Sequence, residues 1–523
     1  MTLRRLVRFS WRQELRRQRG IPRSCQRLSS SVALETTKFK VKQEDRDTVR
    51  PFNEIPGPRS FPVFGTMLDY TPLGPYSLNN MIEASLDRCR KYGKIWLEKV
   101  GGEYMVNLVD PKDIELLVKN EGKTPRRPEI TAIKLAKRKI DRNDGLVNLQ
   151  GEEWQRLRSA VQSLVMRPKS VTRYIPQMDQ VADDFIELMR ELRNEDGEVP
   201  DFQHQLYKWA LESATSMALD TRLGCFERDL DPNSDAFQII AATTDFFGLL
   251  GKLLYGLPIY QYISTPSWKK FVKSLEISTR ISEKYVIETL AEARMSSEQG
   301  GQPDQDRFLV SLLGNTNLTF KEMVDLPVDI MLGGIDTTAH SLVFNLYTLA
   351  TNPEKQEYLH RSVTSQVPSG TPITAEMLPG MRYLKASIKE SARMFPLSIG
   401  IHRYTIKDIE CSGYHIPAGV LVRALTIAGM LPEYCPEPDK FQPERWLREN
   451  RGLHRLSPLL VLPFGYGPRM CLGRRVAEQE LQILLTKLVQ NFRIEWNHGK
   501  MGIKTCVPHA PDQPARFTFI DRR

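Results

Sequence analysis

The sequence lacks the long apolar segments that mark membrane-spanning proteins. No run of 18 or more consecutive apolar residues is present, so we expect neither a spanning helix nor an N-terminal anchor helix. The first 32 residues also lack the apolar h-region of a secretory signal peptide, which excludes that targeting class. There is no fixed-period repeat and no low-complexity tract, which argues against a solenoid.

Paired cysteines and nucleotide-binding motifs are missing as well. None of the seven cysteines forms a C-x-x-C pair, so neither a disulfide framework nor a tetrahedral zinc site is predicted. No G-x-G-x-x-G follows a predicted strand, so the chain has no flavin or nicotinamide fold of its own. A functional cysteine must therefore be identified by its surroundings. The cysteines are Cys25, Cys89, Cys225, Cys411, Cys435, Cys471 and Cys506.

The net charge of +10 is concentrated at the N-terminus. Residues 1–32 hold nine arginines and one acid, Glu14, so they carry +8 and leave +2 for the rest of the chain. An arginine-rich, almost acid-free start with an amphipathic pattern predicts a mitochondrial transit peptide. A disordered basic arm that binds RNA or anionic lipid is the alternative, but no aromatic or RNP-type pattern accompanies it, and we expect no nucleic-acid partner. The polar, aperiodic residues 33–54 predict a linker.

Helical periodicity dominates the rest of the sequence, and its composition of 41% hydrophobic and 26% charged residues is that of a globular protein. Strand-like runs are short and few. The predicted fold class is mainly α with small β-sheets. Helices are predicted at residues 76–92, 112–120, 151–165, 173–195, 203–220, 235–255, 268–298, 321–350, 353–366, 382–394 and 474–492, and strands at 95–99, 104–109, 403–410, 420–423 and 515–520.

One cysteine stands in an unusual loop, PFGYGPRMCLGRR, directly before a predicted helix. A helix N-terminus stabilises a thiolate through its dipole and its unpaired N–H groups, so Cys471 is placed to be anionic. Gly467 and Gly473 allow close approach of the backbone, and Arg469 offers a planar fork to a carboxylate. A single soft anionic ligand beside a flat carboxylated macrocycle describes thiolate-ligated haem. The alternative is an inert cysteine buried in a turn.

This loop resembles the haem-binding loop of the cytochrome P450 family. It matches F-x-x-G-x-R-x-C-x-G at Phe464, Gly467, Arg469, Cys471 and Gly473. The resemblance extends over about residues 51–523 and implies the cytochrome P450 fold, in which a long central helix lies over the haem. It also implies one catalytic domain over residues 55–523, with haem b (iron protoporphyrin IX) as cofactor and the Cys471 thiolate as its axial ligand.

The stretch GGIDTT lies within the predicted helix 321–350, where each glycine costs about 1 kcal/mol relative to alanine and needs a reason. The resemblance supplies one, an oxygen-binding groove in which Asp336 and Thr337 relay protons. Without it, Thr337 would hydrogen-bond to a carbonyl one turn earlier and Asp336 would be a solvated charge. Pro327 departs from the family pattern and either kinks this helix or marks its first turn.

Further motifs acquire roles only through the resemblance. Glu390 and Arg393 in KESARMFP are three apart on a helix and can pair. The resemblance joins them to Arg445 of QPERW in a buried network that braces the cysteine loop. Trp154 and Arg158 match the W-x-x-x-R whose side chains contact the haem propionates, although Trp154 alone reads as a core aromatic. Arg403 occupies a position where the family commonly places another propionate partner.

A haem mono-oxygenase needs electrons, which this chain must borrow. Exposed lysine pairs are usually only solvated. Here, however, the resemblance to mitochondrial members implies that basic residues dock an acidic ferredoxin, which is supplied by its NADPH-dependent reductase. The implied location is the matrix side of the inner membrane, with peripheral association. The docking residues are Lys385, Lys389, Arg474 and Arg475.

The resemblance implies hydroxylation of a lipophilic substrate with O2, and we expect a sterol or steroid of ecdysteroid type. Oxidation of foreign compounds is one alternative. A haem-thiolate isomerase or dehydratase that needs no external electrons is another, and a non-enzymatic gas or haem sensor is a third. The apolar stretch Phe246–Ile263 dips into the inner membrane or forms two buried core helices, and the sequence leaves both open.

Overall fold

The structure is a computed structural model of the chain, and it describes residues 49–62, 64–71, 74–100, 102–228, 230–299, 307–450 and 456–522. Residues 49–523 form one compact unit. The predicted transit peptide, residues 1–32, and residues 33–48 of the predicted linker lie outside the described residues. The last part of that linker belongs to the compact unit, since the Arg50 amide donates to the Gly413 carbonyl at 3.0 Å and the Arg50 carbonyl accepts from His415.

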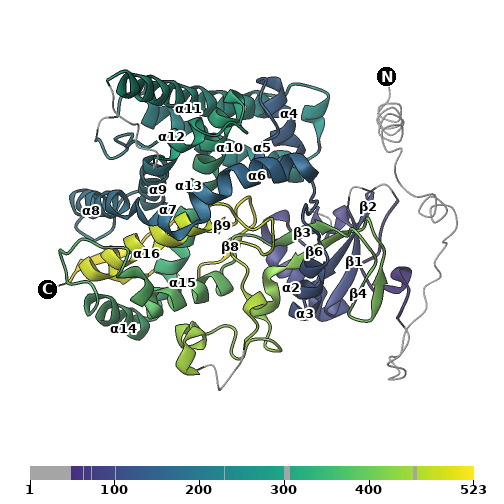
Figure 1. Cartoon of the computed structure of the whole chain (residues 1–523). Coiled ribbons are helices and arrows are strands. Elements are labelled where there is room, and N and C mark those ends of the chain that lie inside the picture. The colour runs from purple at the N-terminus through teal and green to yellow at the C-terminus, as the bar shows by residue number, and fades with distance from the viewer. Residues whose placement is uncertain are drawn as a thin grey trace. The chain divides into compact units, whose positions relative to one another are not determined.

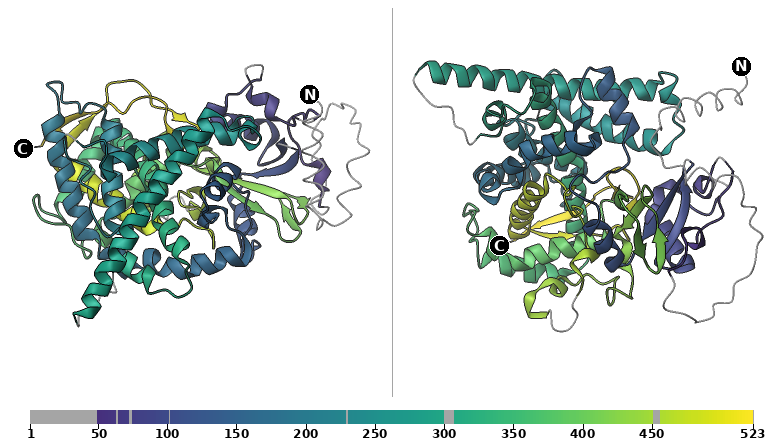
Figure 2. Two further views of the ribbon diagram at one scale, coloured as in Figure 1. Left: turned by 90° about the horizontal axis from the view of Figure 1, so that it is seen from above. Right: turned by 45° about the vertical axis from the view of Figure 1, so that its right-hand side comes forward.

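Helices make up most of this unit and gather in one part of it, while the largest sheet lies in the other (Figures 1 and 2). Local signals explain where several helices begin. Asp110 caps the helix that starts with Pro111, and Thr319 and Glu322 form a reciprocal capping box at the start of the longest buried helix. The helices are α2 (Met81–Tyr92), α3 (Pro111–Lys119), α4 (Thr131–Lys139), α5 (Gly145–Asn148), α6 (Gly151–Met166), α7 (Pro168–Thr172), α8 (Ile175–Leu192), α9 (Phe202–Ala218), α10 (Asp235–Tyr255), α11 (Pro266–Glu298), α12 (Phe308–Leu313), α13 (Phe320–Ala350), α14 (Pro353–Thr364), α15 (Arg382–Met394) and α16 (Arg474–Asn491).

The principal sheet has four strands in the order β1-β2-β6-β3. Strands β1 and β2 form an antiparallel hairpin, β2 pairs with β6 in parallel, and β6 pairs with β3 antiparallel. Three two-stranded sheets complete the β structure of the described residues. The strands are β1 (Ile95–Val100), β2 (Glu103–Leu108), β3 (Gly400–Tyr404), β4 (Ile409–Cys411), β5 (Tyr414–Ile416), β6 (Leu421–Leu425), β7 (Phe492–Glu495), β8 (Ile503–Lys504), β9 (Ala510–Pro511) and β10 (Thr518–Asp521).

The predicted mainly α class is confirmed, and each of the eleven predicted helices corresponds to a helix of the structure. The single strand predicted at residues 403–410 is wrong. Strand β3 ends at Tyr404 and β4 begins only at Ile409, in a different sheet. The intervening turn is held by Asp408, which accepts hydrogen bonds from the Ala418 amide at 2.9 Å and from His415. The short helices α4, α5, α7 and α12 were not predicted, because so few turns carry little periodicity.

Helix α13 lies at the centre of the helical part and packs against α9, α11, α15 and α16 (Figure 1). It runs without interruption through Gly333 and Gly334. Pro327 lies inside this helix and not in its first turn, because the helix already begins at Phe320. The continuous helix brings the GGIDTT stretch into the middle of the fold.

Helix α10 is long and apolar enough to cross a membrane by length and composition, with two or fewer charged residues in an 18-residue window. Helix α10 is not a continuous apolar run, because polar residues such as Thr243 and Thr244 interrupt it, and the sequence criterion of 18 consecutive apolar residues therefore does not predict it. The helix packs against α11 and buries residues including Ile239, Phe246 and Leu250. These contacts are those of a core helix in a folded domain.

Candidate active site

The loop before α16 holds its cysteine by backbone contacts. The Cys471 amide donates to the Phe464 carbonyl at 2.9 Å, which closes the loop on itself. Helix α16 begins at Arg474 with Gly473 as its N-cap, as the sequence predicts. The Gly473 and Arg474 amides donate hydrogen bonds to the Cys471 sulfur, and these contacts favour a thiolate. The predicted position of the cysteine at a helix N-terminus is therefore present in the structure.

The surroundings of the Cys471 thiol are partly open. The side chain is accessible to solvent, whereas Cys225, Cys411 and Cys435 are buried. Even so, protein surrounds the sulfur closely enough for burial to raise the pKa of the Cys471 thiol, against the backbone N–H donors and Arg158, which lower it. The sulfur thus faces an accessible space inside the fold, which is the position that a metal ligand requires.

A cluster of four arginines lies near Cys471, and we call it the arginine cluster. Its members interact electrostatically: Arg158, Arg403 and Arg127 each contribute to lowering the pKa of Arg469, which burial and these like charges bring to about 9. The pKa of Arg127 falls to about 10, first through burial and then through Arg403 and Arg158. Such a concentration of positive charge is costly without anions. The cluster comprises Arg127, Arg158, Arg403 and Arg469.

Protein groups satisfy only part of the arginine cluster. Arg469 donates to the carbonyls of Pro125 and Leu149 at 3.0 and 2.7 Å. Its Nη1 has no partner among the described residues, and neither does the Nε of Arg158. Both atoms are buried. Buried N–H groups of this kind are normally hydrogen-bonded, so they point to acceptors that the protein does not itself provide.

Glu121 is the one carboxylate that pairs with the arginine cluster among the described contacts. Its Oε2 accepts a short hydrogen bond from Arg403 Nε, while its buried Oε1 has no partner in the described part of the chain. A Cβ at Gly467, which has a φ of +78°, would lie 2.0 Å from that Oε1. Glycine is required there because Glu121 approaches so closely and because the backbone is left-handed. Sequence reasoning had assigned this close approach to a flat ligand, not to Glu121.

Trp154 supports the arginine cluster from one side. Its ring lies 4.0 Å from the Arg469 guanidinium, a cation–π contact, and the side chain is buried. Arg158 follows one turn later on α6 and donates to the Met166 sulfur at 3.1 Å. The W-x-x-x-R pattern therefore brings both residues to the cluster. For Trp154, the contact that the structure shows is with an arginine.

One face of the otherwise buried helix α13 borders open space. Ile330, Gly333, Gly334, Thr337 and Ser341 are three or four residues apart, and each keeps accessible surface. A Cβ at Gly333 would meet nothing within 4 Å. Gly333 therefore lies where a side chain would narrow this space, whereas a Cβ at Gly334 would lie 3.7 Å from the Ala214 Cβ of α9.

Thr337 and Asp336 differ in their surroundings. The Thr337 hydroxyl donates to the Gly333 carbonyl at 2.6 Å, which is the local bond that such a residue makes in any helix. Asp336 is not the solvated charge that an isolated motif suggests, because it is 7% exposed. Burial raises the pKa of Asp336 to about 7. The carboxyl can therefore exchange a proton close to neutral pH.

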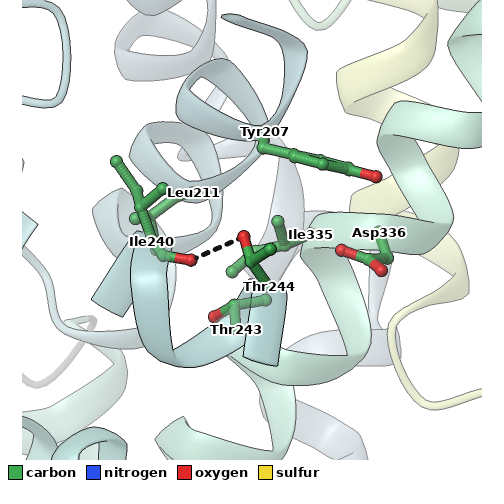
Figure 3. Close-up of a pocket in the computed structure, with 7 residues that line it drawn as sticks. All are labelled: Tyr207, Leu211, Ile240, Thr243, Thr244, Ile335 and Asp336. Carbon is green, nitrogen blue, oxygen red and sulfur yellow. Dashed lines mark hydrogen bonds between the residues drawn. The ribbon is translucent and has the colours of Figure 1, made fainter. Parts of the chain in front are cut away.

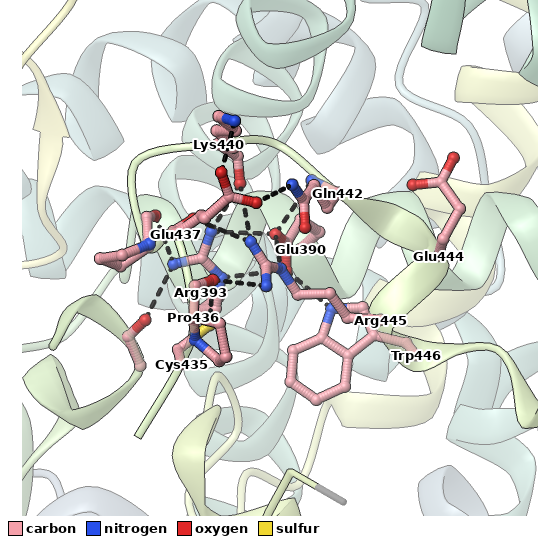
Figure 4. A network of polar contacts seen from close by, with 12 residues as sticks. Glu390, Arg393, Cys435, Pro436, Glu437, Lys440, Gln442, Glu444, Arg445 and Trp446 are labelled. Atoms are coloured by element: carbon pink, nitrogen blue, oxygen red, sulfur yellow. Dashed lines mark hydrogen bonds and ion pairs between the residues drawn. The ribbon is translucent and has the colours of Figure 1, made fainter. Parts of the chain in front are cut away.

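The predicted network of Glu390, Arg393 and Arg445 is present (Figure 4). Glu390 accepts two hydrogen bonds of 2.9 Å from Arg393 and one of 3.0 Å from Arg445 Nε. Trp446 Nε1 also donates to Glu390 at 2.8 Å. Arg393 binds the Gly429 and Pro438 carbonyls in addition. The Glu390 and Arg393 side chains are both 0% exposed, so this is a fully buried ion pair.

The four residues predicted to dock a ferredoxin lie on α15 and α16, and some of their charges are paired. Arg474 lies 2.9 Å from Glu478, and Arg475 lies 3.9 Å from the same carboxylate. Lys385 on α15 is close enough for Arg475 and Glu478 to affect its pKa, which burial lowers. The Lys389 ammonium lies 3.9 Å from the centre of the Trp446 ring. Lys385 of α15 thus lies near Arg475 of α16, while Lys389 lies against Trp446.

Comparison with known proteins settles the family. The family model for cytochrome P450 matches residues 55–508. The chain belongs to the cytochrome P450 family. It is 35% identical to "Cytochrome P450 10" of Lymnaea stagnalis, over 95% of this chain and 90% of that protein. It is 32% identical to two proteins of Drosophila melanogaster, "Probable cytochrome P450 301a1, mitochondrial" and "Cytochrome P450 302a1, mitochondrial", over 94% and 91% of this chain and 91% and 96% of theirs.

As a cytochrome P450, the chain is a mono-oxygenase whose cofactor is haem b with a cysteine thiolate as axial ligand. The residues present fit this group. An accessible sulfur and buried arginine N–H groups without acceptors match an iron ligand and two propionates. Among the described residues, no group of three His, Cys, Asp or Glu side chains offers another metal site.

Sequence reasoning missed two residues of this cytochrome P450 site, Glu121 and Arg127. A signal for Arg127 was available, since RR stands between two prolines in TPRRPE and such a loop is stiff. Arg127 donates to the Val147 carbonyl at 2.6 Å and lies in the same loop as Pro125, which binds Arg469. Nothing in the sequence around Glu121 indicated that it pairs with Arg403, which is 282 residues away.

Proposed function

We propose that this cytochrome P450 hydroxylates a lipophilic substrate of the sterol or steroid class, as RH + O2 + 2 e− + 2 H+ giving ROH + H2O. Electrons come singly from a mitochondrial ferredoxin and its NADPH-dependent reductase. The observation that carries the proposal is the accessible Cys471 sulfur beside four arginines that lack sufficient anions. Relatives named as mitochondrial support the compartment, which for this chain is the matrix side of the inner membrane.

Cys471 would hold the haem iron, and the arginine cluster would hold the propionates. Arg158 and Arg469 have free buried N–H groups for this purpose, and Trp154 keeps Arg469 oriented by stacking. Arg403 is oriented by Glu121 and by the Tyr466 carbonyl at 3.2 Å. When bound, haem with a thiolate ligand supplies the activation of dioxygen. Phe464 and Gly473 would border the sulfur side of the ring, and Glu390, Arg393 and Arg445 would brace the loop.

Asp336 and Thr337 of α13 would supply protons for the reaction. Reduction of dioxygen consumes two protons per turnover, so a buried group that exchanges protons near pH 7 is useful there. Burial gives Asp336 a pKa of about 7, which suits this role. Thr337, on the accessible face of α13, would hand the proton on by turning its hydroxyl away from the Gly333 carbonyl.

Replacing Asp336 by asparagine should make stability less dependent on pH. Because the pKa of Asp336 is raised to about 7, the folded state disfavours ionisation, and stability is lost as pH rises from about 4 to 7. The asparagine variant lacks this loss. At pH 8 its free energy of unfolding should exceed that of the original protein by on the order of 4 kcal/mol, and at pH 4 the two proteins should be about equally stable. Denaturant unfolding at the two pH values measures this, and an equal difference at both would contradict the assigned burial.

The surface around Lys385 should bind the acidic ferredoxin by charge attraction. Replacing Lys385 by glutamate is expected to raise the KM for ferredoxin by about tenfold at low salt, and the difference should shrink at high salt, where charges are screened. Lys269, an exposed lysine of α11, gives a control with the same charge change. A similar KM for both variants would contradict the proposal that this surface binds ferredoxin. The measurement is ferredoxin-dependent NADPH oxidation over a range of ionic strength.

The segment after α10 should contact the membrane surface. Within residues 246–263, α10 buries Phe246, but Leu257 and Ile263 are 75% and 64% exposed. A segment that is buried at its start and exposes apolar side chains at its end favours insertion of that end into the membrane surface over two wholly buried helices. Replacing Leu257 and Ile263 together by serine should weaken binding to anionic vesicles by about tenfold or more, since each buried aliphatic side chain contributes about 1.5–3 kcal/mol. Ile287→Ser, at an exposed site of α11, is the control, and vesicle co-sedimentation is the measurement.

The substrate proposal is tested by difference spectroscopy over a panel of sterols, steroids and foreign compounds, followed by turnover with ferredoxin and its reductase. Displacement of water from the iron by a steroid at low concentration, with an NADPH-dependent hydroxylated product, is expected. Binding confined to foreign compounds would assign a detoxifying role. Product from a lipid hydroperoxide without any reductant would identify an isomerase or dehydratase and refute the mono-oxygenase assignment.

A further inference from the structure

A small pocket lies behind the GGIDTT stretch, between α9, α10 and α13 (Figure 3). Asp336 forms part of its wall, together with Tyr207 from α9 and Thr243 from α10. Its free space has room for about one water molecule. By helix geometry, Ile335 lies about 160° around α13 from Gly333 and Asp336 about 60°, so the pocket extends from the edge of the open face toward the back of the helix.

The wall of this pocket is polar at three points. Asp336 contributes a buried carboxyl, and Tyr207 contributes a phenol. The buried Thr243 Oγ1 has no hydrogen-bond partner among the described residues, unlike Thr244 Oγ1, which donates to the Ile240 carbonyl at 2.9 Å. None of the lining residues is cationic. A buried water normally makes about three hydrogen bonds to such groups.

The Tyr207 hydroxyl is fixed by a chain of hydrogen bonds. His340 Nδ1 lies 3.1 Å from the His509 carbonyl, which can only accept, so the proton of neutral His340 is on Nδ1. Burial lowers the pKa of His340 to about 4 and keeps it neutral. His340 Nε2 is therefore an acceptor, and its nearer donor is the Tyr207 hydroxyl at 2.9 Å, with the Gln203 amide nitrogen at 3.2 Å. Gln203 donates to the Tyr207 oxygen at 2.8 Å, which leaves that oxygen one free acceptor site.

The hydroxyl end of Tyr207 points toward the side of the pocket that contains Asp336 (Figure 3). No direct hydrogen bond joins the two residues in the described contacts, yet Asp336 is close enough for its charge to raise the pKa of Tyr207. We propose that the pocket binds a water molecule that bridges Tyr207 and Asp336, and that this water, by donating a hydrogen bond to the carboxylate, holds Asp336 in the position in which it releases and regains its proton. The proposal rests on the proton-supplying role given to Asp336 above. Tyr207 and His340 act as positioning residues for the water.

The bridge is tested first on the resting holoenzyme, by infrared spectroscopy of the protonated Asp336 carboxyl, whose band is assigned by its loss in Asp336→Asn. Tyr207→Phe removes one partner of the water, and Thr243→Ile fills the pocket while leaving the Tyr207–His340 pair intact. Both should shift the band and its pH midpoint. Thr244→Val, which alters a satisfied hydroxyl of the same wall, should not. A crystal structure should show an ordered water within hydrogen-bond distance of Tyr207 and Asp336. An empty pocket, or equal bands in all three variants, overturns the bridge.

The influence of the water on proton supply is tested by NADPH oxidation with ferredoxin and its reductase in H2O and in D2O. Asp336→Asn should slow the rate by about a hundredfold, as expected for loss of a general acid. Tyr207→Phe and Thr243→Ile should slow it at least about threefold and enlarge the solvent isotope effect, with Thr244→Val unchanged. If Asp336→Asn has its effect and the two pocket variants do not, the water has no influence on proton supply, the proposed bridge fails, and the proposed role of Asp336 stands. If Asp336→Asn has no effect, that role itself fails.

Discussion

Cys471→Ser protein should lack the haem-thiolate spectrum altogether. A serine hydroxyl is a hard donor that stays protonated at neutral pH, so it replaces neither the charge nor the softness of a thiolate. The backbone N–H groups of Gly473 and Arg474 that favour an anion at this position would then face a neutral oxygen. We expect purified protein with little haem, no reduced carbon-monoxide band of the thiolate type, and no NADPH-dependent turnover.

The control for this experiment is Cys89→Ser, at a partly buried free cysteine on α2. Its haem content and carbon-monoxide spectrum should equal those of the original protein. Because the Cys471 side chain is accessible and contributes little packing, its replacement should leave the circular dichroism of the helices unchanged. A thiolate-type carbon-monoxide band in Cys471→Ser protein would show that another group binds the iron, and the whole assignment of the site would fall.

Several of the residues identified from the sequence lie at short spacings that fix their geometry, although the resemblance assigned their roles. Cys471 lies two residues before Gly473, the N-cap of α16, and Glu390 and Arg393 are three apart on α15. Helix geometry alone places such groups. The same holds for Trp154 and Arg158 on α6. Local spacing thus indicated which of these groups can meet, whereas the resemblance supplied the buried network with Arg445 and the propionate contacts of Trp154, Arg158 and Arg403.

The residues that were missed depend on contacts between distant segments. Glu121, which lies two residues after α3, binds Arg403, and Tyr207 binds His340, which is 133 residues away in the sequence. No periodicity records such pairs. The strand wrongly extended over residues 403–410 has a similar cause, since Asp408 ends one strand by binding a loop amide ten residues away. Side chains that stop or redirect the backbone through tertiary contacts are indistinguishable from strand residues in the sequence.

The arginine cluster illustrates how the protein prepares a site for an anionic ligand. Four buried or half-buried guanidinium groups repel one another, and Glu121 offsets only part of that repulsion. The free energy that the repulsion costs the empty protein is recovered when two further carboxylates enter, so binding them also stabilises the fold. Haem loading should accordingly raise the melting temperature. We propose that Glu390, Arg393 and Arg445 brace the cysteine loop, so we expect cofactor retention to depend on this brace as well.

The largest effect on stability is expected from that brace. Glu390→Ala leaves Arg393 and Arg445 without the carboxylate that both bind, in a place where Glu390 and Arg393 are 0% exposed. Removing one partner of a buried pair costs about 3–5 kcal/mol, because the remaining charge stays unpaired away from water. Arg393→Ala should cost a similar amount, and Arg393→Lys should not restore it, since an ammonium cannot make the two parallel bonds to Glu390. We expect both alanine variants to be recovered without haem.

Lys440→Ala, which removes only an exposed pair with Glu437 beside the same network, should keep normal haem and lose at most about 1 kcal/mol. Haem content per polypeptide and urea unfolding measure the two effects, and a Glu390→Ala protein with full haem content would show that the network does not hold the cysteine loop.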